Sequence, residues 1–430
     1  MSNASPHQQT EIVVQKFGGS SVASIEKIRH VARIIADAHD AGKQVVTVLS
    51  AMGDSTDDLL ALATEAAQQQ PSGRDLDALL VTGEMVSVAL MAMTLQQMGY
   101  KAIGLNGQQA GFLVEDLPNR ARILEIDTGR VLHHLSQGEI VLVTGYQGIN
   151  PNGDFATLGR GGSDTSAVAL AGALGASRCD IYTDVDGVYS TDPRVVPKAV
   201  KIDNITYIEM LELARVGAQV LHPRAVETAR QANVQIRVRS TFYPENTGTL
   251  VTESKQLEVN RVVSGIAADE NQTQIVVMDV PDKPGIAGRI FSRLAQQNVS
   301  VDMIIQSMKK EHGGQIVNDI AFTVCDEDLT EALKTLDLVK AELGAAQVVH
   351  DTSVAKISIV GIGMIDQPGV AANMFEALAD SDINIRMIST SEIKISCLID
   401  QALTKKAVQE LHNCFFANTQ QELVDQKIGY

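Results

Sequence analysis

A lysine and a pair of glycines lie where a strand-like run near the N-terminus gives way to a helical pattern. The run ends at Phe17 and helical spacing of apolar residues starts at Ile25, with Lys16 and the turn Gly18–Ser21 at the junction. Backbone N–H groups and the helix dipole at such a junction can hold an anion, and glycine lets a phosphate approach the backbone closely. Neither P-loop nor Rossmann spacing is present, so a nucleotide bound here requires another kind of site. Taken alone, such a turn is more often structural.

A second glycine-rich stretch, residues 157–165, reads Thr-Leu-Gly-Arg-Gly-Gly-Ser-Asp-Thr. Arg160 offers a planar fork that suits a carboxylate, and Asp164 can orient a nearby lysine. A plain surface loop would not need glycine beside so many charged and hydroxyl groups. We therefore favour contact between this backbone and a ligand.

A third stretch reads Tyr-Thr-Asp-Val-Asp-Gly-Val-Tyr over residues 182–189 and Asp-Pro-Arg over 192–194. It follows a predicted strand, and open α/β sheets bind ligands at the carboxyl ends of their strands. Asp184 and Asp186 would serve equally well as turn formers. The residues themselves leave these two interpretations balanced.

The elements that must position these residues are those of a parallel sheet covered on both faces. Residues 45–49, 140–144 and 179–183 form strand-like runs of the kind that such sheets bury. The first ~250 residues therefore predict an α/β layered domain. The stretch Thr241–Thr249, which contains proline, asparagine and glycine, is the predicted exit from it.

The second half of the chain contains a duplication. Each copy predicts a strand, a D-x-P-G turn, an amphipathic helix and a further strand. The matched pairs share one offset, 84 positions from Asp282 to Asp366, and are Asp282/Asp366, Pro284/Pro368, Gly285/Gly369, Ala287/Ala371, Phe291/Phe375, Leu294/Leu378 and Ala295/Ala379. This period is too long for a solenoid repeat and indicates a duplicated small domain.

Composition restricts the partners. With 35 Lys and Arg against 52 Asp and Glu, the net charge is −17, which disfavours nucleic acid and anionic membranes as partners. We expect no membrane-spanning stretch and no secretory leader, because no run reaches roughly 18 apolar residues and the N-terminus is polar. The four widely spaced cysteines are expected to be free, buried thiols in a reducing compartment, which predicts a cytoplasmic protein.

Taken together, the motifs resemble those of a known family. The chain is similar to aspartate kinases in four runs: Val-Gln-Lys-Phe-Gly-Gly-Ser-Ser (14–21), Leu-Ser-Ala-Met-Gly-Asp-Ser-Thr (49–56), Leu-Gly-Arg-Gly-Gly-Ser-Asp-Thr (158–165) and Tyr-Thr-Asp-Val-Asp-Gly-Val-Tyr (182–189). The resemblance spans almost the whole chain. It implies an amino-acid-kinase-type α/β/α sandwich with a mainly parallel sheet, followed by two ferredoxin-like (βαββαβ) ACT domains. The expected limits are 1–255 for the kinase domain and 262–345 and 346–430 for the ACT domains, with the C-terminal tail a candidate to complete the first ACT domain.

The resemblance also implies roles for single residues. Lys16 would neutralise charge on the transferred phosphoryl group and Asp164 would position Lys16, so these two are the expected catalytic residues. Arg160 would hold the α-carboxylate of aspartate, and Glu84 its ammonium group. Further substrate contacts are expected from Thr56, Gly161, Gly162 and Ser163, and nucleotide contacts from Lys16, Phe17, Gly18, Gly19, Ser20, Thr183, Asp184, Tyr189, Arg194, Gln219 and Val220. Glu84 and Thr56 lie near predicted helix termini, where such residues also act as caps.

The expected reaction needs no general base, because the β-carboxylate of aspartate is ionised at neutral pH and can attack the γ-phosphoryl of ATP directly. The product would be 4-phospho-L-aspartate, the first intermediate toward lysine, threonine and methionine. Mg²⁺ is expected to arrive with ATP, and no metal site formed by the protein itself is predicted. His222, which precedes a proline, is interpreted as structural.

The second half of the chain, with its two expected ACT domains, is predicted to bind an amino-acid effector. By resemblance to threonine sites of the family, its contacts would come from Asp282, Lys283, Pro284, Gly285, Ile286, Ala287, Asp302, Gln306, Asn384, Ile385, Ser391 and Glu392. The segment 309–318 and Gln367 differ from lysine-regulated relatives, which favours threonine over lysine, although drift in an exposed turn would give the same pattern. In the kinase half, Gln219 replaces a lysine that is frequent in relatives, and Tyr146 replaces a phenylalanine.

Two rival functions are open at this point. A glutamate or acetylglutamate kinase would share the phosphate-binding residues but need not carry the ACT pair, and the Glu84, Thr56 and Arg160 set favours aspartate. A silent amino-acid sensor would keep the fold, but Lys16 and Asp164 argue against it. The expected partners are L-aspartate, threonine or lysine, further copies of the chain joined through ACT contacts and, as in some relatives, a shorter ACT-only subunit.

Overall fold

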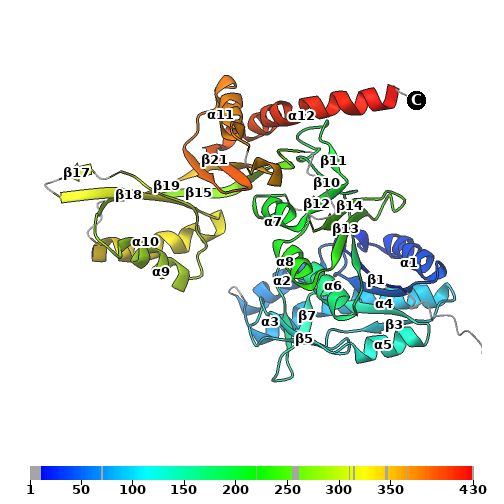
Figure 1. Ribbon diagram of the computed structural model, residues 1–430. Helices are drawn as coiled ribbons and strands as arrows, with labels where there is room; N and C mark the ends of the chain where they lie inside the picture. Colours follow the sequence, from blue (N-terminus) through cyan, green and yellow to red (C-terminus); the bar gives the residue numbers. More distant parts are fainter. Residues whose placement is uncertain are drawn as a thin grey trace, which may run out of the picture. The chain divides into compact units, whose positions relative to one another are not determined.

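The chain divides into two units in the computed structural model, which describes residues 11–68, 71–218, 220–253, 261–308, 310–312, 315–343, 347–365 and 367–428. Within the described residues, the first unit runs to Val188 and continues with Lys201–Ala214 and Gln219–Glu258. The second contains Tyr189–Val200, Arg215–Ala218 and the chain from Val259 onward. Two short excursions of the N-terminal half therefore belong to the second unit (Figure 1).

The main sheet of the first unit has the strand order β12-β14-β13-β9-β1-β2-β6-β3. Its pairings are parallel except for that between β13 and β14. The strands are β1 (Ile12–Phe17), β2 (Gln44–Leu49), β3 (Ala102–Leu105), β6 (Ile140–Thr144), β9 (Arg178–Thr183), β12 (Asn204–Thr206), β13 (Gln235–Ser240) and β14 (Thr249–Thr252). The mainly parallel sheet and its predicted strands are confirmed.

Helices cover both faces of this sheet. Phe17, Leu49 and Tyr182 lie on one face and join α1 (Ile25–Asp40) and α4 (Thr82–Gln97) in a buried cluster. Because side chains alternate along a strand, Lys16 points to the other face, where α6 contacts β1. The remaining helices are α2 (Ser55–Ala67), α3 (Arg74–Leu80), α5 (Gly129–Ser136), α6 (Gly162–Ala173), α7 (Tyr207–Arg215) and α8 (Pro223–Ala232). Burial on both faces accounts for the continuous apolar strands.

A smaller sheet in the first unit has the strand order β5-β4-β7-β8. Its strands are β4 (Phe112–Val114), β5 (Ile123–Ile126), β7 (Gln147–Ile149) and β8 (Phe155–Thr157). Strand β8 leads into the second glycine-rich stretch. Two further short strands are β10 (Val188–Tyr189) and β11 (Lys201–Ile202), at the two ends of one excursion.

The second unit contains one antiparallel sheet with the order β16-β18-β15-β19-β21-β20, to which β17 adds beside β18. Its strands are β15 (Gly265–Pro281), β16 (Asp302–Gln306), β17 (Lys310–His312), β18 (Gln315–Val324), β19 (Gln347–Val360), β20 (Met387–Thr390) and β21 (Lys394–Asp400). Its helices are α9 (Ile286–Gln296), α10 (Leu329–Leu343), α11 (Val370–Asp380) and α12 (Thr404–Ile428).

The duplication is visible in the backbone. Helices α9 and α11 have 11 residues each, and their first residues are Ile286 and Val370, 84 positions apart. The glycine before each helix is left-handed, with φ of +89° at Gly285 and +99° at Gly369, a conformation that costs glycine little. Asp366, the predicted partner of Asp282, lies outside the described residues.

The second repeat is discontinuous in the chain. Its hydrophobic cluster, built around α11 and β21, also takes in Val263 and Ile266, which precede the first repeat. Strands β15 and β19 pair over most of their length, so the first half of β15 lies in the second repeat and its second half in the first. The tail was a candidate to complete the first repeat, but Leu411 and Phe416 of α12 pack in the cluster of the second.

The stretch Thr241–Thr249 is not an exit from the sheet. It joins β13 to β14, which pairs antiparallel with β13, as in Val238 with Thr249. Gly248 has φ of +72°, and a Cβ there would lie 1.9 Å from the carbonyl oxygen of Val238. The turn residues therefore mark a hairpin connection within the sheet.

One expectation about composition needs correction, and a second can be compared with the structure. One described helical stretch, Arg74–Gln97, is long and apolar enough to cross a membrane by length and composition, although half of it is buried in the structure, as in the core helix of a globular domain. The four cysteines are free as expected, but only Cys179 and Cys397 are buried, and Cys414 is exposed on α12.

Candidate active site

Lys16 and Asp164 form an ion pair between a central strand and a helix N-terminus. Lys16 lies near the carboxyl end of β1, hydrogen-bonded on either side to β2 and β9. Asp164 lies in the first turn of α6, and its Oδ1 is 2.5 Å from Lys16 Nζ. The two side chains are 11% and 14% exposed. The pair predicted from sequences 148 positions apart is therefore assembled, with a small opening to solvent.

The turn after β1 packs against the loop after β2. The N–H of Gly53 donates to the carbonyl of Gly19 at 3.1 Å, and the N–H of Ser50 donates to Phe17. A Cβ on Gly19 would lie 3.0 Å from the carbonyl oxygens of Ala51 and Gly53. Gly18 and Gly19 both have ordinary φ, so Gly19 is required for space and not for a left-handed backbone.

Glu84 is a buried carboxyl group with one oxygen unused. It lies in the first turn of α4 and is 3% exposed. Its Oε1 accepts a hydrogen bond from the N–H of Ala51 at 3.2 Å, whereas Oε2 has no partner among the described residues. Burial raises the pKa of Glu84 to about 7. A buried acceptor without a donor is costly, which points to a ligand cation as its partner.

The second glycine-rich stretch is held by residues from α8. Arg224 donates 2.7 Å hydrogen bonds to the carbonyls of Leu158 and Ala121. His222 caps α8, and a Cβ on Gly161 would lie 2.1 Å from its ring. Arg160 lies between left-handed Gly159 and Gly161 and is exposed. The structure thus gives His222 the structural role expected for it, and leaves the Arg160 side chain exposed at this loop.

Asp77 is a positioning residue that sequence reasoning missed. Its fully buried carboxylate accepts from the N–H and Oγ1 of Thr157 at 2.9 and 2.8 Å, and from the N–H of Asn119. It therefore anchors the start of the second glycine-rich stretch. No local signal marks it, because Asp77 and Thr157 are 80 positions apart. Arg224 was missed for the same reason.

Tyr146 contacts the second glycine-rich stretch and α6 through its backbone. It has a left-handed φ of +71°, which is uncommon outside glycine and often found at functional sites. Its N–H donates to Ser166 Oγ of α6 at 3.1 Å, and its carbonyl accepts from the N–H of Leu158 at 2.8 Å. Burial raises the pKa of its hydroxyl.

The other predicted residues of the first unit are distributed as follows. Ser163 packs on Gly145, where a Cβ would lie 2.7 Å from it, and Thr56 is half-buried in the first turn of α2. Thr183 donates to the exposed carboxylate of Asp184 at 2.9 Å. Gly162 begins α6, Phe17 stacks on Tyr182, and Ser20 accepts from Lys27 Nζ. Val220 is half-buried, and Gln219 lies outside the described residues.

Tyr189 and Arg194 belong to the second unit. The guanidinium of Arg194 donates to the carboxylate of Asp192 at 2.8 Å, and these hydrogen bonds hold the pKa of Asp192 below its usual value. These two predicted nucleotide contacts therefore belong to the same unit as the C-terminal domains.

The predicted effector residues lie at four places in the second unit. Asp282–Ala287 form the turn before α9 and its first two residues, and Asn318 donates to Asp282 at 3.4 Å. The others lie on β16 (Asp302, Gln306), before β20 (Asn384, Ile385) and between β20 and β21 (Ser391, Glu392). Burial favours the neutral form of Asp302, yet the hydrogen bond and charge of Lys356 lower its pKa overall. No contact among the described residues joins the full set.

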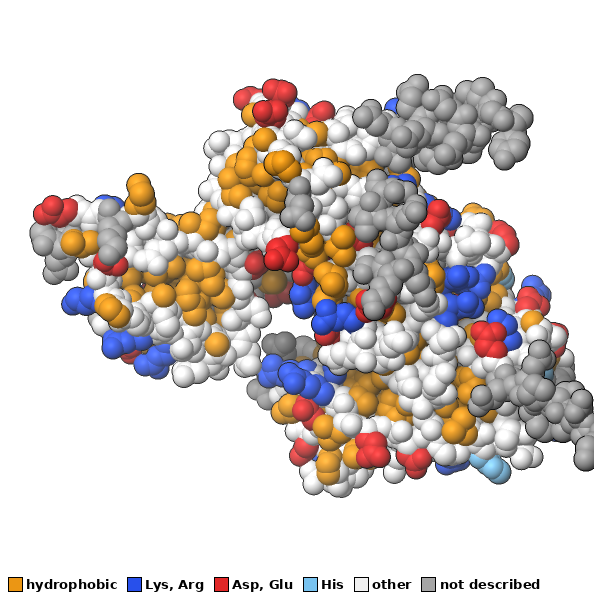
Figure 2. Space-filling view, viewed as in Figure 1, with side chains coloured by type: hydrophobic (Ala, Val, Ile, Leu, Met, Phe, Trp, Pro, Cys, Tyr) orange, Lys and Arg blue, Asp and Glu red, His pale blue; other side chains and the backbone are white. Residues whose placement is uncertain are grey.

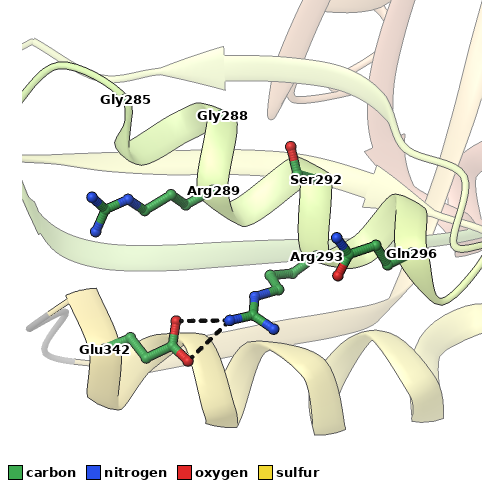
Figure 3. Close-up of a pocket in the computed structure, with 7 residues that line it drawn as sticks. All are labelled: Gly285, Gly288, Arg289, Ser292, Arg293, Gln296 and Glu342. Carbon is green, nitrogen blue, oxygen red and sulfur yellow. Dashed lines mark hydrogen bonds and ion pairs between the residues drawn. The ribbon is translucent and has the colours of Figure 1, made fainter.

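A pocket of about 460 Å³ lies on the helical face of the first repeat (Figure 3). Arg289, Ser292 and Arg293 extend from α9, and Arg293 pairs with Glu342 of α10 at 3.3 Å. Of the predicted site residues it contains only Gly285, so it does not correspond to the kinase site. We assign it no role in catalysis.

The residues of the first unit fit a nucleotide and an amino acid. Lys16, the glycine turn and the N-terminus of α6 offer positive charge and N–H groups of the kind that hold phosphates. The unused oxygen of Glu84 offers a place for an ammonium group. Among the described residues, no group of three His, Cys, Asp or Glu side chains is arranged to hold a metal ion.

Comparisons with known proteins agree with this chemistry. The model of the amino acid kinase family matches residues 11–240, and ACT domain models match 273–344 and 357–415. An aspartokinase of Geobacillus stearothermophilus is 48% identical over 94% of this chain and 97% of its own length. An aspartokinase of Pseudomonas aeruginosa is 46% identical over the same shares.

The solved structures that resemble this chain are also aspartokinases. Aspartokinase III of E. coli, in complex with aspartate and ADP, has a TM-score of 0.81 and 29% identity, covering 94% of this chain and all of that one. The aspartate kinase of Synechocystis is 45% identical, with a TM-score of 0.52, over 94% of this chain and 69% of that one. With its paired Lys16 and Asp164 and its two ACT domains, the chain belongs to the aspartokinase family and is an ATP-dependent kinase.

Proposed function

We propose that this enzyme transfers the γ-phosphoryl group of ATP to the β-carboxylate of L-aspartate, giving 4-phospho-L-aspartate and ADP. The observation that carries the proposal is the buried Glu84 carboxyl group, whose free Oε2 suits the ammonium group of an amino acid. Ala51 connects it to the phosphate side of the site, because Ala51 donates to Glu84 and its carbonyl lies against Gly19.

Each side chain has a defined task in this reaction. Lys16, oriented by Asp164, screens the negative charge of the transferred group. The α6 N-terminus adds its dipole on the same side, and the exposed guanidinium of Arg160 receives the α-carboxylate. Glu84 fixes the ammonium group and so places the ionised β-carboxylate for attack. The protein supplies alignment and screening, and no base is needed.

Mg²⁺ enters the proposal together with ATP, where it would neutralise phosphate charge. We assign it no ligand set made by protein alone. Aspartate as the acceptor is supported by the E. coli relative, which was solved with aspartate and ADP.

We further propose that threonine, more than lysine, controls the enzyme through the ACT domains. The support is the predicted effector set, which includes the charged Asp302 and the turns before α9 and β20. Another E. coli aspartokinase III structure contains lysine and aspartate, which makes lysine the second candidate. The pathway leading to lysine, threonine and methionine and a cytoplasmic location belong to the same proposal.

Assembly through the ACT domains is also proposed. Exposed apolar side chains gather in the second unit, including Met308 (90% exposed), Ile316 and Ile304. Figure 2 shows hydrophobic side chains clustered on the visible face of the domain that contains α9 and α10. Apolar surface of this kind usually marks a contact with another chain. We expect further copies of this chain, with a shorter ACT-only subunit as an additional partner.

The test is ATP-dependent acyl phosphate formation, trapped as the hydroxamate, with aspartate compared with glutamate. We expect product from aspartate only, its loss in Lys16→Ala, and inhibition by threonine at concentrations where lysine has little effect. Product from glutamate would contradict the substrate assignment. No product from any amino acid would favour an amino-acid sensor.

A further inference from the structure

Two excursions of the N-terminal half are packed into the second unit, and both carry or adjoin proposed nucleotide contacts. The chain leaves the first unit after Val188 and returns at Lys201, and the segment between contains Tyr189 and Arg194. The second excursion, Arg215–Ala218, directly precedes Gln219 and Val220. We define these as the 189–200 segment and the 215–218 segment.

Ser190 is the anchor of the 189–200 segment. It is completely buried, its N–H donates to the carbonyl of Val200 at 2.8 Å, and its Oγ accepts from the N–H of Val200 at 2.9 Å. The same Oγ lies 3.0 Å from Nε2 of His412, a buried residue of α12. Its carbonyl accepts from the N–H of Ile266 on β15 at 2.7 Å. Ser190 therefore joins both ends of the segment to α12 and β15.

Further contacts tie the rest of the segment to α12. Gln409 donates through Nε2 to the carbonyl of Val195 at 3.2 Å. Val196 is buried in the same hydrophobic cluster as Leu411 and Phe416. The ring of His412 stacks on Phe416 with centroids 4.9 Å apart, which fixes the direction of its Nε2. Helix α12 therefore holds the 189–200 segment by the His412 side chain, by a hydrogen bond to the segment's backbone and by burial of Val196.

The 215–218 segment is held independently by β15. Gly217 has φ of +113°, and a Cβ there would lie 2.2 Å from the carbonyl oxygen of Ala268. Only glycine allows this close approach of two backbones. Ile266 and Ala268 lie on the same half of β15. The two segments therefore contact neighbouring positions of one strand.

We propose that α12 and the first half of β15 position the 189–200 and 215–218 segments for their nucleotide contacts, with His412, Gln409 and Ser190 as positioning residues that do not touch the substrates. This inference rests on the proposed assignment of Tyr189, Arg194 and Val220 to the nucleotide. Aspartate is held by residues of the first unit alone in the same assignment. Loss of these contacts is therefore expected to weaken ATP binding and to leave aspartate binding unchanged.

The experiment uses the full chain with Gln409→Ala and His412→Ala, and Asn413→Ala as the matched control, because Asn413 is exposed on the same turn of α12. Affinity for Mg-ATP is measured by titration calorimetry, and KM for ATP, KM for aspartate and kcat by the acyl phosphate assay. We expect ATP to bind roughly 3- to 10-fold more weakly in Gln409→Ala and at least as weakly in His412→Ala, as for one lost hydrogen bond. KM for aspartate should match the wild type in both variants. The Asn413→Ala control should match the wild type in every measured quantity.

The outcomes separate the alternatives. Unchanged ATP affinity in both variants would overturn the proposal, and so would a fall in kcat with both KM values unchanged, which is what a merely structural role would give. If His412→Ala lowers Tm sharply, Gln409→Ala decides, because its side chain is exposed. Failure of the proposed function would show as no acyl phosphate in the wild type, whereas the calorimetric comparison does not depend on turnover.

Discussion

Each unit places a lysine on a strand inside its sheet and pairs it with an aspartate, but the two pairs differ in surroundings. In the first unit, Lys16 and Asp164 lie 2.5 Å apart and both are nearly buried. In the second, Lys356 of β19 lies 2.9 Å from Asp302 of β16, with the lysine 5% and the aspartate 54% exposed. One pair is enclosed on both sides, whereas the other exposes its acid to solvent.

The difference follows from the two kinds of sheet. In a parallel sheet covered by helices, strand ends and helix N-termini converge on one edge, so charges placed there meet in a partly buried site. In the antiparallel sheet of the second unit, one face can stay open, and Lys356 links strands of the two repeats. The first arrangement suits chemistry on a bound anion, whereas the second leaves the acid accessible to solvent.

The largest expected effect is on the enclosed pair. Lys16→Ala should lower kcat roughly 10³-fold, because a cation facing the transferred phosphoryl group is lost. Steady-state acyl phosphate formation measures this. Threonine binding, followed by calorimetry, should persist, and its loss would show that the two units are not separable as described.

Glu84→Gln should come next. The substitution keeps the shape but removes the charge, so KM for aspartate should rise roughly 10- to 100-fold, as for a lost hydrogen bond to a charged group. KM for ATP should change little. Equal effects on both substrates would place Glu84 outside the amino-acid site.

The pH dependence of aspartate binding tests the same residue without a mutation. Burial raises the pKa of Glu84 to about 7, so protonation removes its charge as the pH falls through that value. Aspartate affinity should then fall roughly 10-fold from about pH 8 to about pH 6, since free aspartate itself does not titrate in this range. Glu84→Gln should give a flat profile, and a slope of equal size in that variant would assign the titration to another group.

The smallest expected effect is on the open pair. Lys356→Met keeps much of the packing, and Asp302 can be solvated, so the free energy of unfolding should fall by about 1 to 2 kcal/mol. The half-inhibitory concentration of threonine should rise several-fold with kcat unchanged. Chemical denaturation and inhibition curves measure the two effects. A large loss of kcat would mean that the two lysines are not functionally distinct.

The sequence alone determined the strands, the glycine turns, the repeat and the family. These features depend on local patterns: runs of apolar residues, glycines beside charged groups and a constant offset of 84 positions between Gly285 and Gly369. The ion pair of Lys16 and Asp164 could be predicted only because both residues lie in motifs whose order matches the family. The loop Thr241–Thr249 shows the limit of local patterns, since a hairpin and an exit use the same turn residues.

Only the tertiary structure decided which of these residues share an environment. The free oxygen and raised pKa of Glu84 come from burial by distant segments, and Asp77 reaches Thr157 across 80 positions. The same holds for the discontinuous second repeat and for Ser190 beside His412, which are 222 positions apart. Burial and hydrogen bonding depend on contacts between segments far apart in the chain, and no local pattern of residue types encodes those contacts.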